Sequence, residues 1–231
     1  LFQALPGLRG FWPMSAFDSG GDCFDQSGNS RTLTYNGGEG VGPVYNYDSL
    51  APYIRFDGTG DYLSRPDEAG LDILGTEAYV GTPGLTLGGW FRPERVTATE
   101  SLISKWAAAA NFSYVLQADG AVAGDPARFY ISDDGANTSN VSSTSGFVVD
   151  TWQFIAGRFN DGDPGKELAV WLNDELTTAA TARASIFNGN ADFNISGHNS
   201  GTSLFLGKAS MCFLCAASLS AAAVWAIYQH T

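Results

Sequence analysis

Short runs in which apolar and polar residues alternate recur along most of the chain, separated by turns rich in Gly, Asp, Asn or Pro. A period of two is typical of strands that bury one face. Leu85–Arg92, for example, alternates and stops at Pro93. The predicted strands are Gly10–Pro13, Thr32–Tyr35, Tyr53–Phe56, Tyr62–Ser64, Leu85–Arg92, Ser101–Lys105, Ser113–Gln117, Arg128–Ser132, Trp152–Asn160, Glu167–Leu172, Phe193–Ser196, Ser203–Lys208 and Met211–Ala216.

Helical periodicity is convincing only near the C-terminal end, over Ser220–Gln229. Ser220 suits an N-cap, and Val224, Ile227 and Tyr228 fall on one helical face. A shorter helix or turn is predicted at Asp67–Ile73. Many short strands followed by one helix, with no repeat or low-complexity linker, predict an all-β fold: a single domain over residues 1–231, built as a sandwich of two antiparallel sheets.

The turn Asp57-Gly-Thr-Gly-Asp61 raises the question of whether it binds a ligand or only folds the chain. Closely spaced carboxylates could hold a hard cation, which prefers oxygen ligands. Gly also supplies positive φ, and Asp bonds to its own turn backbone. The spacing is too compact for an EF-hand, so we interpret the turn as a hairpin that joins two strands of one sheet.

The composition of the chain limits the classes of molecule that it can bind. The chain has 12 Lys and Arg against 24 Asp and Glu, a formal net charge of −12. Because nucleic acid binding requires clustered basic residues, we exclude a nucleic acid partner. The apolar run Met211–Tyr228 approaches the length of a membrane-spanning helix. Its interruption at Ser218-Leu-Ser220 favours a strand followed by a helix, so we predict no membrane span.

In their order, these segments resemble the laminin G-like, concanavalin A-like jelly-roll domains, from about Leu8 to Tyr228. The matching motifs are Trp12-Pro13, Asp25-Gln-Ser-Gly-Asn29, Phe56-Asp57-Gly58 with Asp61-Tyr62, Leu85–Pro93, Ile103–Trp106, Thr151-Trp152, Leu168–Asn173 and Leu219-Ser220. The resemblance implies a jelly roll with a short C-terminal helix, located outside the cell or on a virion surface. It implies a recognition or structural module of an extracellular or virion assembly, such as a phage capsid decoration or tail. The resemblance does not decide whether the chain forms a homo-oligomer.

Such a module would contact its protein or glycan partner through rim loops at 106–112, 133–146 and 160–165. Trp106 precedes an Ala-rich loop and is the Trp best placed for exposure, whereas Trp12, Trp90, Trp152 and Trp171 lie in predicted strands and suit a core. Alternatively, the Asp-rich loops at 133–146 and 160–165 are turns exposed to solvent that bind no ligand. The candidate binding residues are Trp106, Asn111, Asp133, Asp134, Asn137, Asp161 and Asp163.

A second interpretation is a lectin-like module that binds carbohydrate with the help of calcium. The resemblance places Asp25 and Asn29 in a loop that can lie near a structural Ca²⁺. The acidic residue expected before the closing helix is replaced by Met211–Ala216, so an Asx turn is the competing interpretation.

Catalysis has little support in the sequence. Glycosidases of this fold carry paired carboxylates on one strand. None of the Glu residues at positions 39, 68, 77, 94, 100, 167 and 175 forms that pattern. Gly-x-Ser-x-Gly is also absent. We therefore predict that the chain is not an enzyme, with a glycoside hydrolase as the least favoured alternative.

Three cysteines leave several chemistries open. Cys212-x-x-Cys215 has the spacing of a zinc or redox pair, but no second pair follows. The simplest interpretation is three buried thiols. If the first and last strands are neighbours, as the resemblance implies, a disulfide from Cys23 to Cys212 or Cys215 becomes feasible.

Overall fold

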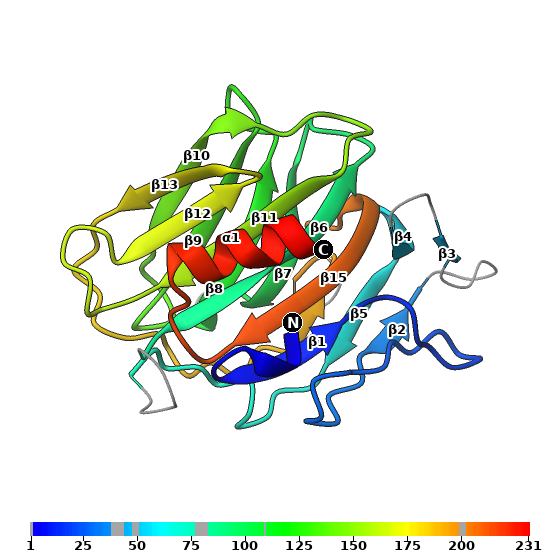
Figure 1. The fold of residues 1–231 in the computed structure, drawn as a ribbon, viewed down its shortest axis with the longest axis horizontal. Helices are drawn as coiled ribbons and strands as arrows, with labels where there is room; N and C mark the ends of the chain where they lie inside the picture. Colours follow the sequence, from blue (N-terminus) through cyan, green and yellow to red (C-terminus); the bar gives the residue numbers. More distant parts are fainter. Residues whose placement is uncertain (1, 38–43, 48–50, 77–82, 109, 199–201) are drawn as a thin grey trace.

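The computed structural model describes residues 2–37, 44–47, 51–76, 83–108, 110–198 and 202–231, and they form a two-sheet sandwich (Figure 1). One sheet runs in the order β13–β12–β11–β6–β15–β4–β3, with β1 also paired to β15. Its strands are β1 (Leu8–Trp12), β3 (Val44–Tyr47), β4 (Pro52–Asp57), β6 (Leu85–Pro93), β11 (Gln153–Phe159), β12 (Leu168–Leu172), β13 (Glu175–Ala179) and β15 (Leu206–Cys215).

The second sheet has seven strands in the order β10–β9–β8–β7–β14–β5–β2. They are β2 (Thr34–Asn36), β5 (Tyr62–Arg65), β7 (Thr99–Trp106), β8 (Phe112–Asp119), β9 (Pro126–Ile131), β10 (Ser139–Gly146) and β14 (Phe193–Ile195). All pairings within both sheets are antiparallel. The predicted antiparallel jelly-roll sandwich is confirmed.

The main core lies between the sheets because the alternating strands direct one apolar face inward. Trp12, Phe91, Phe129 and Phe193 are all completely buried there. Close approach of the sheets requires Gly157 on β11, because a Cβ at that position would lie 2.5 Å from the Phe129 ring on β9. The Trp and Phe content of the sequence therefore serves mainly to fill this space.

A second, smaller core lies on the outer face of the eight-stranded sheet, under α1 (Ala221–His230) and the short 3₁₀ helix η1 (Phe2–Ala4). Val224 and Ile227 of α1 pack there with Phe154 and Phe213 of the sheet. The predicted cap is present, since Ser220 Oγ accepts the Ala223 N–H at 3.2 Å. Among the described residues, no helix is long and apolar enough to cross a membrane.

The turn at Asp57–Asp61 connects the two layers. β4 belongs to the eight-stranded sheet and β5 to the seven-stranded one, so the predicted hairpin within one sheet is wrong. The turn chemistry was anticipated: Gly58 has φ +73°, and Asp57 Oδ1 accepts the N–H groups of Thr59 and Gly60 at 2.8 and 3.0 Å. Burial raises the pKa of Asp57, but these bonds and the Thr59 hydroxyl outweigh burial and lower it to about 2.

Two further predictions needed correction. The region 133–146 is not one loop, because Ser139–Gly146 forms the edge strand β10 despite its Ser and Thr content. The two predicted strands 203–208 and 211–216 are one strand, β15, whose register shifts between Ser210 and Phe213, where Met211 has φ +50°. Strand β3 was not predicted at all.

The cysteines are buried thiols, and the predicted disulfide from Cys23 to Cys212 or Cys215 is wrong for this structure. The first and last strands are neighbours as expected, with Trp12 opposite Cys212. Cys23, however, lies beyond β1 in the segment before β2, and its Sγ is 3.6 Å from the Met14 sulfur. Burial raises the pKa of Cys212 well above its ordinary value, which favours the thiol.

Candidate functional site

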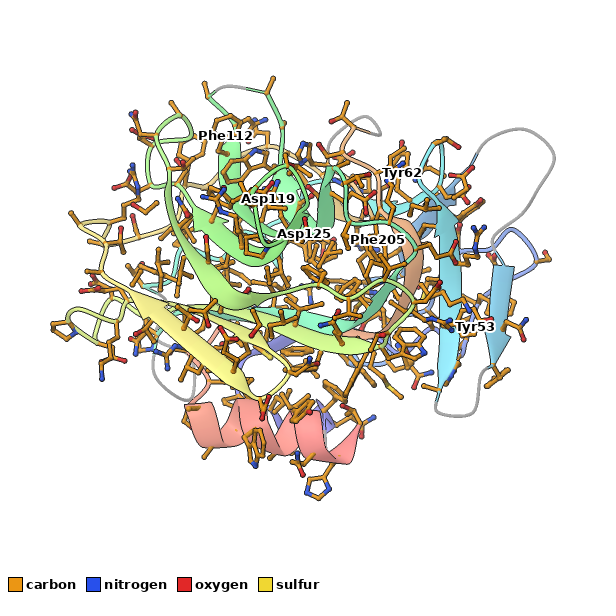
Figure 2. All side chains as sticks on the ribbon, turned by 90° about the horizontal axis from the view of Figure 1, so that it is seen from above. Tyr53, Tyr62, Phe112, Asp119, Asp125 and Phe205 are labelled. Carbon is orange, nitrogen blue, oxygen red and sulfur yellow. The ribbon has the colours of Figure 1, made fainter. Side chains whose placement is uncertain are left out.

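Three connecting segments meet at one end of the sandwich: residues 107–108 and 110–111 of the β7–β8 turn, the β9–β10 turn at 132–137, and the segment 185–190. Backbone bonds join them, from Phe112 N–H to Gly135 O at 3.0 Å and from Phe187 N–H to Ser132 O at 2.7 Å. Asn111 Oδ1 accepts the Asn190 N–H at 2.7 Å. We call these three segments the loop end. Figure 2 shows Phe112 on the side of the molecule remote from α1.

Asp134 organises the middle segment. Its Oδ1 accepts the N–H groups of Ala136 and Asn137 at 2.9 and 2.7 Å, and its Oδ2 accepts the Asn137 side-chain amide at 2.7 Å. The bonds from Asn137 and Ala136 hold the pKa of Asp134 well below its usual range. Asp134 is therefore a carboxylate that fixes the turn at neutral pH.

Two glycines let the segments approach one another. Gly135 has φ +79°, and a Cβ there would lie 2.7 Å from the Phe187 ring and 2.9 Å from Ala110 O. A Cβ at Gly189 would lie 2.6 Å from Asn111 Oδ1. Larger residues at either position would force the loops apart.

A buried lysine lies beneath the loop end. Lys105 of β7 is only 1 % exposed, and its Nζ is 2.8 Å from Asp67 Oδ1 and 3.0 Å from Asp72 Oδ1. The same ammonium donates to Gly189 O. Burial raises the pKa of Asp72, and Lys105 offsets part of that effect. The Asn188 amide, with its nitrogen toward Asp72, lies 2.7 Å from Oδ1. Lys105 thus ties segment 185–190 to the sandwich.

Three aromatic rings extend from the loop end along β7, β8 and β9. Trp106 stacks on Phe112 with a centroid distance of 4.4 Å and an interplanar angle of 11°. Tyr130 meets Trp106 edge-on at 6.2 Å, and the Arg128 guanidinium lies 5.0 Å from the Tyr130 centroid. These rings are half-buried and belong to neither packed core. They form the aromatic row.

Next to the aromatic row is an open hollow of about 300 Å³. Its lining is mainly amide and backbone, from Ala110, Asn111, Phe187, Asn188, Gly189 and Asn190. We call it the amide hollow. Converging side-chain amides beside aromatic rings are the groups that orient a polar ligand with an apolar face.

The structure therefore brings together five of the seven predicted binding residues. Trp106 and Asn111 are in the aromatic row and the hollow, and Asp133, Asp134 and Asn137 are in the adjoining turn. Asp133 is already engaged by Arg183, which also donates to Ser139 Oγ at 3.1 Å. Whether any of the seven contacts a ligand stays a prediction.

Asp161 and Asp163 lie elsewhere, on the β11–β12 turn. Asp163 binds Arg158 Nη2 at 3.2 Å, and Asp161 lines a separate hollow with Gly75 and Thr76. Sequence reasoning missed segment 187–190 altogether. The available signal was Phe187-Asn-Gly-Asn190, a turn sequence with two amides.

The predicted calcium residues are occupied by protein donors. Asp25 Oδ1 accepts the N–H groups of Phe11 and Ser27, and Oδ2 accepts the Ser27 hydroxyl and the Arg31 N–H, at 2.8–3.0 Å. A carboxylate has about four acceptor sites, so all are used. Asn29 Nδ2 donates to Leu8 O at 3.0 Å. As arranged, the Asp25 carboxylate therefore has no acceptor site left for a calcium ion. Calcium binding in solution stays a prediction.

A family profile described as the concanavalin A-like lectin/glucanases superfamily matches residues 57–224. The chain belongs to this family. The matched span runs from the Asp57 turn to α1 and includes every segment of the loop end. No curated protein matches the chain.

Solved structures show the same fold at low sequence identity. The binding domain of Paraclostridial Mosquitocidal Protein 1 matches with a TM-score of 0.69 and 12 % identity, over 96 % of this chain and 52 % of that one. Domain 4 of AbnA, an extracellular arabinanase from Geobacillus stearothermophilus in complex with arabinotriose, matches with a TM-score of 0.69 and 16 % identity, over 97 % and 99 % of the two chains.

A botulinum neurotoxin type C structure, a protein whose cell entry depends upon interaction with two ganglioside molecules, matches with a TM-score of 0.69 and 9 % identity. The match covers 99 % of this chain and 51 % of that one. This chain thus spans about half the length of the toxin domains and nearly all of the arabinanase domain. At 9–16 % identity these likenesses show the fold alone and do not define a ligand.

Proposed function

We propose that this chain is a non-catalytic module that binds glycans at the loop end. One observation carries the proposal: the aromatic row and the amide hollow adjoin where Phe112 follows Asn111, so stacked rings and side-chain amides occur together at the loop end. Sugar rings have apolar C–H faces and hydroxyl edges. The Trp106–Phe112 pair suits the faces, and the side-chain amides of Asn111 and Asn190 suit the hydroxyls.

The electrostatics of the loop end support recognition over catalysis. Asp133 and Asp134 are each held by specific donors, Arg183 and the turn at 136–137. Asp67 and Asp72 share the single ammonium of Lys105, and burial raises the pKa of Asp72. Among the described residues of the loop end, no pair of carboxylates is left to flank a scissile glycosidic bond.

The proposal is tested by presenting the whole chain to a glycan array and measuring the affinity of each hit by calorimetry. Trp106→Ala is expected to weaken the hits at least tenfold, because stacking on one ring contributes roughly 1–3 kcal/mol by analogy with bases on aromatic side chains. The matched control is Trp225→Ala, which removes an exposed Trp from α1 and should leave affinity unchanged.

The proposal would be overturned if no glycan on the array bound the chain, or if Trp106→Ala left the affinity unchanged. Repeating the array with EDTA separates the calcium-assisted lectin from a calcium-independent one. If EDTA and Trp106→Ala each abolish glycan binding, calcium assists binding at the loop end. The melting temperature of each variant confirms that it is folded.

A second function, a structural role in an extracellular or virion assembly, is favoured by a different surface. Val122, Val148 and Val149 are 41 %, 55 % and 41 % exposed, and their turns are joined by the Phe147 N–H to Asp125 O bond at 2.9 Å. This apolar patch lies at the end of β8 opposite the loop end. Sedimentation of the chain as a single monomeric species, alone and with candidate assembly subunits, would argue against this role.

A further inference from the structure

The outer face of the eight-stranded sheet carries a second hollow, at the C-terminal end of α1. It has a volume of about 200 Å³ and is lined by Ala51, Trp90, Trp152, Ser210, Tyr228 and Thr231. We call it the α1 groove. The C-terminal end of α1 lies over β6 and β15 in Figure 1. Figure 2 shows Tyr53, whose ring contacts Trp152 of the groove, well apart from Phe112 of the loop end.

Aromatic carbon dominates the lining of the α1 groove. Trp90 stacks on Tyr228 at 5.7 Å, and Tyr53 lies 6.1 Å from Trp152. The Trp90 indole N–H donates to Thr231 Oγ1 at 2.8 Å, so this polar atom is already used. Ordinary small-molecule pockets measure about 300–1,000 Å³, so this smaller space suits a single ring.

A row of cations crosses the sheet beside these rings. Lys208 on β15 is the Cα partner of Arg55 on β4 and of Arg92 on β6. Like charges directly opposite one another destabilise a sheet. Three of the chain's 12 basic residues thus meet in one row of a protein with a net charge of −12.

Carboxylates form short ion pairs with the two arginines of this row. Glu94 pairs with Arg55 through two bonds of 2.9 and 2.5 Å, and Asp150, 65 % exposed, reaches Arg92 at 3.4 Å. Asp57 and Asp61 also act electrostatically on Arg55, and Lys208 and Arg92 act on Glu94, so the row as a whole carries no excess of positive charge. Within the described parts of the chain, Lys208 forms no ion pair, and its Nζ lies 4.5 Å from the Tyr53 ring centroid.

We propose that the α1 groove binds a carboxylate-bearing sugar, with the ring against Trp152 and Trp90 and the carboxylate directed to Lys208. The aromatic lining provides for the apolar face of one ring, and the Lys208 ammonium, which has no ion-pair partner among the described residues, provides for an anion at its edge. A neutral sugar would satisfy the aromatic surface but leave Lys208 without a carboxylate. This site is separate from the loop end.

The test is calorimetry of the whole chain with trigalacturonate and with its methyl ester, in which neutral ester groups replace the charged carboxylates. The acid should bind at least tenfold more tightly than the ester, with an advantage that shrinks as salt screens the charge. Lys208→Met should remove the preference, and Lys208→Arg should keep it. Trp152→Ala should weaken both ligands.

Two control variants keep the test specific. Lys166→Met removes an exposed lysine on the β11–β12 turn and should leave the preference intact. Trp106→Ala alters the loop end and should also leave it intact, which separates this inference from the proposed glycan site.

The inference is overturned if acid and ester bind equally, if neither binds, or if Lys208→Met keeps the preference. It is equally overturned if Trp106→Ala abolishes binding of the acid, which would place the ligand at the loop end. Thermal melting of each variant confirms folding.

Discussion

The loop end and the α1 groove both place aromatic rings beside polar groups, but they are held by different forces. The loop end is held by turn bonds and by the buried Lys105 with its carboxylates. The α1 groove is set by strand register, which puts Trp90 opposite Ser210 and Lys208 opposite Arg92. Electrostatic changes should therefore damage the first region and leave the second largely intact.

Lys105→Met should produce the largest difference between the regions. Removing one partner of a buried ion pair typically costs about 3–5 kcal/mol, and because Asp67 is 32 % exposed we expect about 3 kcal/mol. The free energy of unfolding is measured in urea, and binding at the loop end should fall with it. Lys208→Met, the matched change in the groove, should alter stability by only about 0.5 kcal/mol. Equal losses in the two variants would refute the contrast.

Glu175→Gln should have an intermediate effect and spare both surfaces. Glu175 on β13 accepts the Thr144 N–H and hydroxyl at 2.6 Å each, which joins the edges of the two sheets. Burial raises the pKa of Glu175, but the bonds from Ser145 and Thr144 outweigh burial and lower it to about 2. We expect a loss of about 1 kcal/mol at pH 7 without a change in either affinity.

The pH dependence gives a check on the same residue. Because the folded pKa of Glu175 lies below its ordinary 4.5, its stabilisation is complete above pH 4.5 and is lost as the pH falls toward 2. The difference in melting temperature between wild type and Glu175→Gln should therefore shrink from pH 7 to pH 2.5. A constant difference across that range would show that the carboxylate charge is not the cause.

Asn137→Ala should have the smallest effect and sharpen the boundary of the loop end. Its side-chain amide is already bonded to Asp134, so we expect a change in unfolding free energy within about 0.5 kcal/mol. Glycan affinity at the loop end should change less than twofold. A tenfold loss of affinity with unchanged stability would instead assign Asn137 a direct contact with the ligand.

The sequence predicted the loop end better than the α1 groove, because the loop end depends on local turn bonds and the groove depends on strand register. Asp134-Gly135 and Asn111 were recognisable because turn residues act on their own neighbours. Trp90 and Trp152 were assigned to the core because both lie in or beside apolar strands. The structure has them half-buried on the outer face, where they line the α1 groove. Alternation marks two faces of a strand but does not say which layer covers the second face.

By itself, the sequence determined the strand-rich architecture, the terminal helix with its Ser220 cap and the chemistry of the Asp57 turn. Each depends on interactions within a few residues, namely periodicity, capping and Asx bonding. Only the tertiary structure decided that β4 and β5 separate into different sheets, that Phe187–Asn190 reaches Asn111, and that Lys208 meets Arg55 and Arg92. These outcomes depend on how two sheets twist and stack, because burial of the whole core, not local preference, selects the register and layer of each strand.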